Sequence, residues 1–207
     1  MGARGDGDPK VALDAADAWL RFALVFAEEI AADPDNGPRR ALENLGELVV
    51  SATQLLTAIE YYLRALGMRL KLELTRKHEL LPLFRALPNG LQDRIEQNTR
   101  AVAPGLDGRA KAVELIWYVA APGQSPPRQP SNDSGRSAAK DAHELVRRYS
   151  SLLNDWRFLF ERGTVGQYSR LHYDFDELRR LALGIRQTIV QVDPQLFRTR
   201  SQQPASI

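Results

Sequence analysis

The feature that most constrains the fold is an apolar residue that recurs every three or four positions between residues 42 and 66. The spacing is 3, 4, 3, 4, 3, 4, 3 through Leu42, Leu45, Val49, Ala52, Leu56, Ile59, Leu63 and Leu66. This period places these side chains on one face of an α-helix that begins near Pro38 and stops at Gly67. At 1.5 Å per residue the helix is about 40 Å long. We expect so long a seam to pack against other helices or another subunit.

Periodic apolar residues predict helices on both sides of this segment as well. A first helix over residues 9–32 begins with Pro9, a residue suited to a first turn. Its packing stripe is expected to consist of Trp19, Phe22, Phe26 and Ile30. Later helices are expected over residues 90–101, 139–163 and 175–191. The last has Asp174 as its candidate N-cap and Glu177 in capping-box register. The predicted fold class is therefore all-α.

Three segments depart from the helical pattern. Alternating leucines near 68–74 favour a short extended link over a continued helix with a wide apolar face. The apolar stretch 112–120 stays unassigned. Pro, Gly and Ser dominate residues 121–138, which predicts a disordered loop. The expected organisation is a flexible tail at 1–8, a single helical domain formed by 9–120 and 139–191, the inserted loop, and a flexible tail at 192–207.

The absence of several residue types and motifs excludes whole classes of function. The 207-residue chain has no cysteine, which excludes disulfide frameworks, thiolate nucleophiles and sulfur-ligated zinc. No apolar run reaches the roughly 18 residues of a membrane span, and the start lacks signal-peptide features. We expect a cytoplasmic protein without a membrane partner. Phosphate-loop, nucleophile-elbow, dinucleotide and His-Glu-x-x-His motifs are missing, so no cofactor and no metal are expected.

Charge is distributed unevenly along the chain. Residues 1–66 contain 6 Lys and Arg against 11 Asp and Glu, whereas residues 67–207 contain 22 against 15. The positive second part permits a polyanionic partner such as RNA or a nucleotide. Of the 28 basic residues 23 are Arg, whose guanidinium suits bidentate phosphate contacts. A solvated surface of mixed charge explains the same distribution, so both interpretations stay open.

The three histidines are the candidate acid-base groups. His172 precedes the last helix next to Arg170, and Arg157 lies on the helix before it. An imidazole and two guanidinium groups that converge in the turn between those helices would suit chemistry at a phosphate. His143 lies near a helix start beside acidic residues, where a solvent-facing position is the default. Pro82 is comfortable only in a first turn, so a helix begins close to His78, which we interpret as a helix-junction residue.

Four segments together resemble the HEPN superfamily of bacterial helical proteins. They are "SATQLLTAIEYYLRALGM", "RKHELLPLFRALP", "NDWRFLFERG" and "YDFDELRRLALGIRQTI", and the similarity covers roughly residues 39–191. The resemblance implies a four- or five-helix bundle, often dimeric, in a family of metal-independent ribonuclease toxins, defence proteins and non-catalytic members. Its catalytic members carry Arg, then four to six residues, then His. Arg170 and His172 are too close for that pattern, and only Arg136 with His143 matches it.

Two hypotheses of function follow. The first is a HEPN-like protein that binds or cleaves RNA in a toxin-antitoxin or antiphage system, with a cognate antitoxin or other protein as a partner. Its candidate catalytic residues are His172, Arg157, Arg170 and His143. The second is a non-catalytic module in which the 42–66 seam builds a homodimer or receives a partner helix. The departure from the family's Arg-to-His spacing favours the second hypothesis, whereas the residues around His172 support the first.

Overall fold

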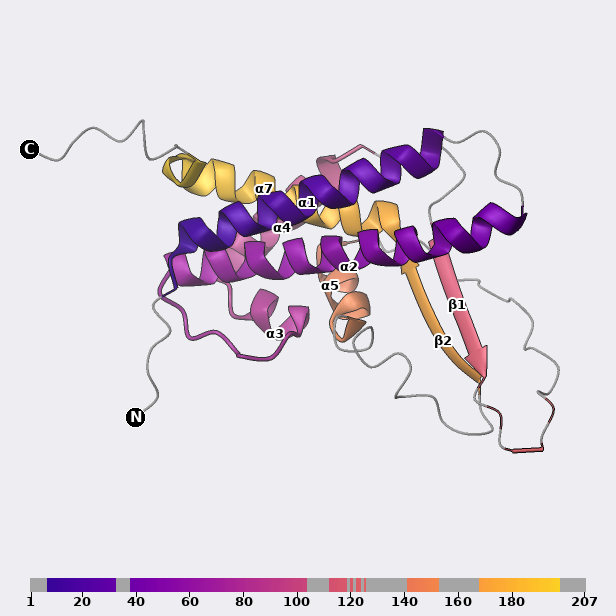
Figure 1. Ribbon diagram of the computed structural model, residues 1–207. Coiled ribbons are helices and arrows are strands. Elements are labelled where there is room, and N and C mark those ends of the chain that lie inside the picture. Colours follow the sequence, from indigo (N-terminus) through magenta and orange to yellow (C-terminus); the bar gives the residue numbers. More distant parts are fainter. Residues whose placement is uncertain are drawn as a thin grey trace, which may run out of the picture.

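The two long helices at the start of the chain form an antiparallel pair (Figure 1): α1 spans Pro9–Ala32 and α2 spans Pro38–Arg69. Helix α7, Phe175–Val192, packs against α2 and runs parallel to it. The predicted helices over 9–32 and 175–191 are thereby confirmed. The computed structural model describes residues 7–32, 38–103, 112–118, 141–152 and 168–197, together with 120, 122, 123 and 125.

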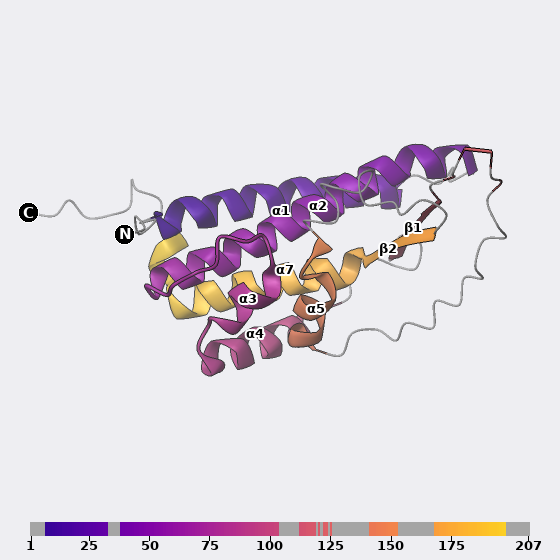
Figure 2. The same cartoon turned by 90° about the horizontal axis from the view of Figure 1, so that it is seen from below.

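Shorter helices pack along the other side of α2 and α7. They are α3 (Leu80–Arg85), α4 (Asn89–Ala101) and α5 (Ala142–Tyr149), and Figure 2 places α4 on the opposite side of the bundle from α1. Every one of these helices contributes to a single hydrophobic core. The predicted all-α class is confirmed for this core.

The predicted seam of α2 lies inside the bundle rather than on its surface. Its members from residue 52 onward are at most 2% exposed, namely Ala52, Leu56, Ile59, Leu63 and Leu66. They pack in the same core as α1, α3 and α7. The side chains of Leu42 and Leu45 lie outside the described residues. The hypothesis that this seam receives a partner is therefore wrong for residues 52–66, because helices of the same chain already cover them.

Helix α1 packs with a different face from the one we predicted. Trp19 and Phe22, expected in the packing stripe, are exposed. The buried face consists of Ala12, Leu13, Ala16, Leu20 and Ala23. Alanines bring the helix backbones closer than aromatic side chains do, so the smaller apolar face fits against α2. The side chains of Phe26 and Ile30 lie outside the described residues.

The chain reverses at the end of α2 through a helix-terminating motif centred on Lys71. The Lys71 N–H donates to the Met68 carbonyl at 3.0 Å and the Leu72 N–H to the Gly67 carbonyl at 2.9 Å. This is the Schellman pattern, with Lys71 in the left-handed conformation at φ 55°. The prediction that Gly67 stops the helix is wrong by two residues. Gly67 instead permits close approach, because a Cβ there would lie 2.5 Å from Leu74 Cδ2.

Two strands form an antiparallel sheet at one end of the bundle (Figure 1). Strand β1 (Ala112–Tyr118) pairs with β2 (Tyr168–Asp174), in a register from Ala112 opposite Asp174 to Tyr118 opposite Tyr168. Strand β2 leads directly into α7, where a turn was expected. Asp174 caps α7 as predicted, since its Oδ1 accepts the Glu177 N–H at 3.0 Å.

The remaining predictions concern linking segments and tails. The extended link expected near 68–74 is confirmed only for residues 72–75, which are non-helical but form no strand, whereas Met68 and Arg69 still belong to α2. The predicted loop 121–138 lies almost entirely outside the described residues, as do 1–6 and 198–207. Pro194–Phe197, part of the predicted C-terminal tail, forms the 3-10 helix η1. No helix in the described ranges is both long enough and apolar enough to cross a membrane.

Candidate functional site

Two of the residues predicted to be catalytic near the last helix, Arg170 and His172, lie in strand β2. Arg170 is paired with Ile116 of β1, and His172 with Glu114. The expectation that His172 sits in a turn between helices is wrong, because β2 continues to Asp174. Arg157 lies outside the described residues, so its convergence with His172 and Arg170 stays a prediction.

His143 faces solvent on α5, as the default interpretation expected. Its ring meets Phe84 of α3 edge to face, with ring centroids 6.1 Å apart and an interplanar angle of 69°. Asp141 caps the helix by accepting the Glu144 N–H at 2.6 Å. Arg136, the residue with matching spacing, lies outside the described residues. Within the described chain, His143 is held by a ring contact alone.

His78 is the histidine whose ring the described structure orients through a charged partner. Its Nδ1 lies 2.9 Å from Glu60 Oε1 and 3.0 Å from Glu60 Oε2. The Glu60 side chain is only 5% exposed, whereas the His78 side chain is 44% exposed. His78 lies two residues before α3, which begins at Leu80 with Glu79 as its N-cap. The contact with a buried carboxylate adds a chemical feature that the sequence interpretation lacked.

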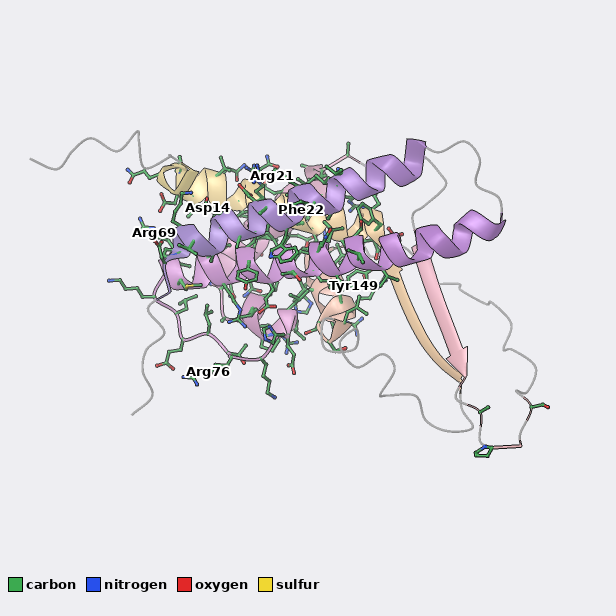
Figure 3. All side chains as sticks on the ribbon, in the orientation of Figure 1. Asp14, Arg21, Phe22, Arg69, Arg76 and Tyr149 are labelled. Atoms are coloured by element: carbon green, nitrogen blue, oxygen red, sulfur yellow. The ribbon has the colours of Figure 1, made fainter. Side chains whose placement is uncertain are left out.

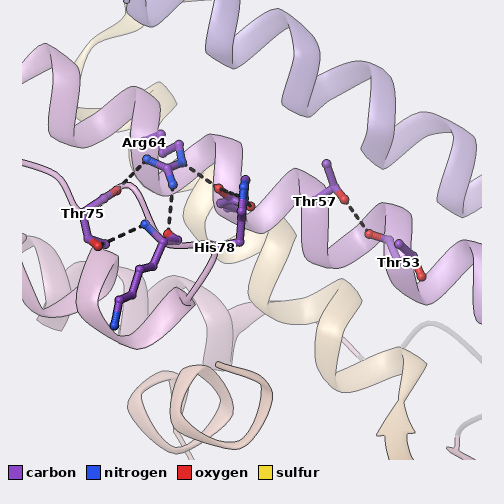
Figure 4. Close-up of polar contacts among 7 residues, drawn as sticks. Thr53, Thr57, Arg64, Thr75 and His78 are labelled. Carbon is purple, nitrogen blue, oxygen red and sulfur yellow. Dashed lines mark hydrogen bonds and ion pairs between the residues drawn. The ribbon is translucent and has the colours of Figure 1, made fainter. Parts of the chain in front are cut away.

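Arg64 fixes both the carboxylate and the segment that carries His78 (Figure 4). Its Nε donates to Glu60 Oε1 at 2.7 Å, one helical turn away on α2. Its two terminal nitrogens donate to the carbonyls of Thr75 and Lys77 at 3.0 and 3.1 Å. The Arg64 guanidinium therefore binds both the Glu60 carboxylate and the backbone on either side of Arg76. These contacts position the His78 imidazole, which follows in the chain.

The local fold explains why the link reaches Glu60 at all. The left-handed Lys71 turns the chain back along α2, and Arg64 then holds residues 75–77 against that helix. Helix α3 starts at Leu80, whose N–H donates to the Ser150 carbonyl at the end of α5 at 3.3 Å. The Leu81 N–H donates to Ser150 Oγ at 2.9 Å. His78 thus lies between residues 75–77, which Arg64 holds against α2, and helix α3, which is bound to the end of α5.

This arrangement suits proton transfer at the outer nitrogen of the imidazole. A carboxylate that accepts from Nδ1–H fixes the neutral ring in the tautomer with a lone pair on Nε2. In the described part of the chain, Nε2 makes no hydrogen bond. Arg76 and Lys77, which precede His78 directly, are exposed, and Figure 3 shows Arg76 away from the helices. The His78 cluster, defined as Glu60, Arg64 and His78, therefore combines a candidate base with neighbouring positive charge.

A second polar cluster lies between α5 and α7 and is centred on the buried Glu177. Arg148 Nη1 lies 3.0 Å from each Glu177 carboxylate oxygen, and the Tyr149 hydroxyl donates to Oε2 at 2.6 Å. The same hydroxyl accepts the Asp174 N–H at 3.0 Å. Burial raises the pKa of Tyr149 far above its usual value, and the Glu177 charge raises it further. Every member of this Glu177 cluster is engaged within the chain.

A third polar contact ties α1 to α2 and α7. The Tyr62 hydroxyl donates to Asp17 Oδ1 at 2.6 Å, and Arg186 Nε donates to the same oxygen at 2.9 Å. Burial, together with the hydrogen bond to Asp17, raises the pKa of Tyr62 well above its usual value. We interpret this contact as a brace between three helices, because the phenol is buried.

Sequence reasoning missed Glu60 and Arg64, although a signal for them exists. Thr53, Thr57, Glu60 and Arg64 follow a spacing of 4, 3, 4, so they form a polar stripe beside the apolar seam of α2. Thr53 Oγ1 donates to the Val49 carbonyl at 2.9 Å. Thr57 Oγ1 donates to the Thr53 carbonyl at 2.8 Å (Figure 4). A carboxylate and a guanidinium in such a stripe, in the last third of a packed helix, indicate a polar partner outside the helix.

Known proteins do not identify this site. In the ranges that the structure describes, no three His, Asp or Glu side chains are arranged to hold a metal ion. Comparisons of the chain with protein-family models, with curated proteins and with solved structures found no match.

Proposed function

We propose that this protein is a HEPN-like helical protein that binds RNA and cleaves it without a metal, with His78 as the proton-transferring residue. The observation that carries the proposal is the contact of a half-exposed imidazole with a buried, arginine-held carboxylate. The helical bundle, with three of the four quoted segments on α2, α3 and α7, is compatible with the family resemblance. The fourth segment, 154–163, lies outside the described residues. A toxin-antitoxin or antiphage system, with a cognate antitoxin as partner, is the cellular setting that we propose.

The proposed reaction is an internal transesterification of the RNA backbone. Nε2 of His78 accepts the proton of a ribose 2′-hydroxyl as its oxygen attacks the adjacent phosphorus. The bond from phosphorus to the 5′-oxygen breaks, the 5′-oxygen takes a proton from water, and a 2′,3′-cyclic phosphate remains. Glu60 stabilises the imidazolium that forms, since it already binds Nδ1. No oxidant and no cofactor is required.

Arg76 and Lys77 are the residues that we propose for the phosphate. Both are exposed and lie within two residues of His78 in sequence, and the carbonyls on either side of Arg76 are held by Arg64. Arg64 itself is a positioning residue, because its nitrogens already bind Glu60, Thr75 and Lys77. Exposed cations next to a proton acceptor would neutralise phosphate charge as it develops in the transition state.

The test is cleavage of RNA by purified protein in the presence of a metal chelator. We expect His78→Ala to lower the rate at least about 100-fold, the usual contribution of a positioned acid-base residue. His143→Ala and His172→Ala test the two histidines that the sequence made candidates. His143→Ala, which removes an exposed histidine from α5, is expected to leave the rate unchanged. Full activity of His78→Ala would overturn the assignment, and intact RNA with every preparation would overturn the ribonuclease proposal.

RNA binding provides a readout that does not depend on cleavage. Affinity is expected to fall steeply with added salt, because binding releases counterions from the RNA. Removing one phosphate contact by Arg76→Ala or Lys77→Ala should reduce the slope of log affinity against log salt by about 0.7. Arg94→Ala on α4 is the control for loss of an exposed positive charge elsewhere. Equal slopes for all variants would exclude this surface from RNA binding.

A further inference from the structure

Helix α1 carries an apolar face that the rest of the described chain leaves uncovered. Its large members are Val11, Phe22 and Val25, at 64%, 58% and 52% exposed, with Trp19 at 39%. The partly buried Ala15 and Ala18 lie between them. An apolar patch of several adjacent side chains is a typical mark of an interaction site, whereas single exposed apolar residues are ordinary.

These residues form one stripe along the helix. Val11, Ala15, Ala18, Phe22 and Val25 follow each other at spacings of 4, 3, 4, 3, which places them on one face. At 1.5 Å per residue the stripe is about 21 Å long. It is symmetric about Ala18, since Val11 and Val25 are each seven residues away. Small residues at the centre allow another helix to approach closely, and larger ones lie toward both ends.

Two opposite charges flank the stripe on one side. Asp14 and Arg21 are seven residues apart, two helical turns, so they lie on the same flank of α1 (Figure 3). Asp14 contacts Lys10 in the same helix but keeps an exposed side chain. Arg21 is exposed and makes no hydrogen bond or ion pair with the described part of the chain. Like the apolar residues, the two charges are placed nearly symmetrically about Ala18.

We propose that this face, called the α1 stripe, binds the α1 stripe of a second copy of the chain in an antiparallel arrangement. A two-fold axis near Ala18 would place Val11 of one copy against Val25 of the other. The same axis brings Asp14 of each copy to Arg21 of its partner, which gives two equivalent ion pairs. Self-complementary charge therefore selects a second copy over an unrelated partner. This interface is separate from the 52–66 seam, which the chain fills itself.

The test measures mass in solution by light scattering at micromolar concentrations. Wild-type protein is expected at twice the chain mass of 23.2 kDa. Phe22→Glu, which introduces a charge at an already exposed position, should yield folded monomers with an unchanged circular-dichroism spectrum. A monomeric wild type would overturn the proposal. If that monomer sedimented with phosphatidylglycerol vesicles, the α1 stripe would bind a lipid surface instead of a second copy.

Charge reversal tests the antiparallel register specifically. Asp14→Arg gives a chain with two arginines on the flank, and Arg21→Asp gives a chain with two aspartates. Each variant alone should dimerise more weakly than wild type, by about tenfold or more for two repelled pairs. An equimolar mixture should form heterodimers, because both pairs are then complementary, and the double variant should regain homodimers. A mixture that forms no heterodimer would exclude this register.

The control variant is Arg94→Asp on α4, which reverses an exposed charge on the opposite side of the bundle (Figure 2). It should leave the dimer intact. Loss of the dimer in this control as well would show that general charge, rather than the α1 stripe, governs association, and would overturn the proposal.

Discussion

Two buried glutamates, Glu60 in α2 and Glu177 in α7, each bind an arginine, but they differ in the third partner. Glu177 contacts the buried Tyr149, whose hydroxyl also accepts a backbone N–H. Glu60 contacts His78, whose side chain is 44% exposed. The two clusters therefore have similar charged groups and opposite access to solvent.

The difference separates a structural brace from a candidate site. A buried carboxylate is tolerated when its oxygens are fully engaged, and the Glu177 cluster meets that condition inside the chain. In the His78 cluster the same engagement orients a half-exposed imidazole that reaches the surface. Removing the two glutamates should therefore affect different properties of the protein.

The largest expected effect is loss of stability on removing Glu177. Glu177→Ala leaves Arg148 without its main partner and the Tyr149 hydroxyl without an acceptor, so we expect a loss of about 3–5 kcal/mol in the free energy of unfolding. Glu60→Ala should cost about 2 kcal/mol, because His78 can be solvated and Arg64 keeps two carbonyl acceptors. Urea unfolding followed by circular dichroism measures both.

Activity should respond in the opposite order. Glu60→Gln keeps an acceptor for Nδ1 but removes the charge, and it should lower RNA cleavage with little loss of stability. Glu177→Gln is the matched control and should leave the cleavage rate of the folded fraction unchanged. If both variants lost activity in proportion to their lost stability, the distinction between brace and site would not hold.

The second effect concerns the stability of the Glu177 cluster at high pH. Burial raises the folded-state pKa of Tyr149, so its stabilising contribution is present below the unfolded pKa of about 10 and is lost as pH rises above it. Tyr149→Phe should make the alkaline loss of stability shallower by at most about 1.4 kcal/mol per pH unit. Unfolding by urea between neutral pH and high pH gives this slope.

The control for this prediction is Tyr61→Phe, since Tyr61 is an exposed tyrosine on α2. It should leave the slope unchanged. At neutral pH, Tyr149→Phe should cost about 1–2 kcal/mol, because Glu177 and the Asp174 N–H each lose a hydrogen-bond partner. An identical alkaline slope in wild type and Tyr149→Phe would mean that Tyr149 titrates normally.

The sequence predicted α1, α2, α4 and α7 to within two residues, because their apolar residues recur at helical spacing. The helix predicted over 139–163 is wrong in length within the described residues, where α5 ends at Tyr149. The capping of α7 by Asp174 and the burial of Leu56 and Ile59 could be predicted from local spacing. The sheet could not, since β1 and β2 are about 50 residues apart in sequence and their pairing is non-local. Two apolar faces compete on α1, and periodicity alone does not say which one packs against α2.

The His78 cluster was hidden for a related reason. Glu60 and His78 are 18 residues apart, and they meet only because the chain reverses at Lys71. That left-handed position is usually a glycine, so a lysine there gives no signal. The glycine that indicated a helix end was instead Gly67, four residues earlier. Its role in the structure is to leave room for the Leu74 side chain. His78 precedes α3, as the position of Pro82 indicated, but its carboxylate partner could not be inferred from the sequence.

The smallest expected effect concerns that reversal at Lys71. Lys71→Gly relieves a left-handed conformation that costs a non-glycine residue about 1 kcal/mol, while it adds flexibility to the unfolded chain. We expect a net gain of about 0.5 kcal/mol in the free energy of unfolding, with RNA cleavage unchanged. Lys71→Ala removes the same charge but keeps the strain, so it should give no gain. Equal effects of Lys71→Gly and Lys71→Ala on stability would exclude backbone strain at Lys71. If Lys71→Gly stabilised the fold but lowered RNA cleavage, the chain reversal would have to be rigid in order to hold His78 against Glu60.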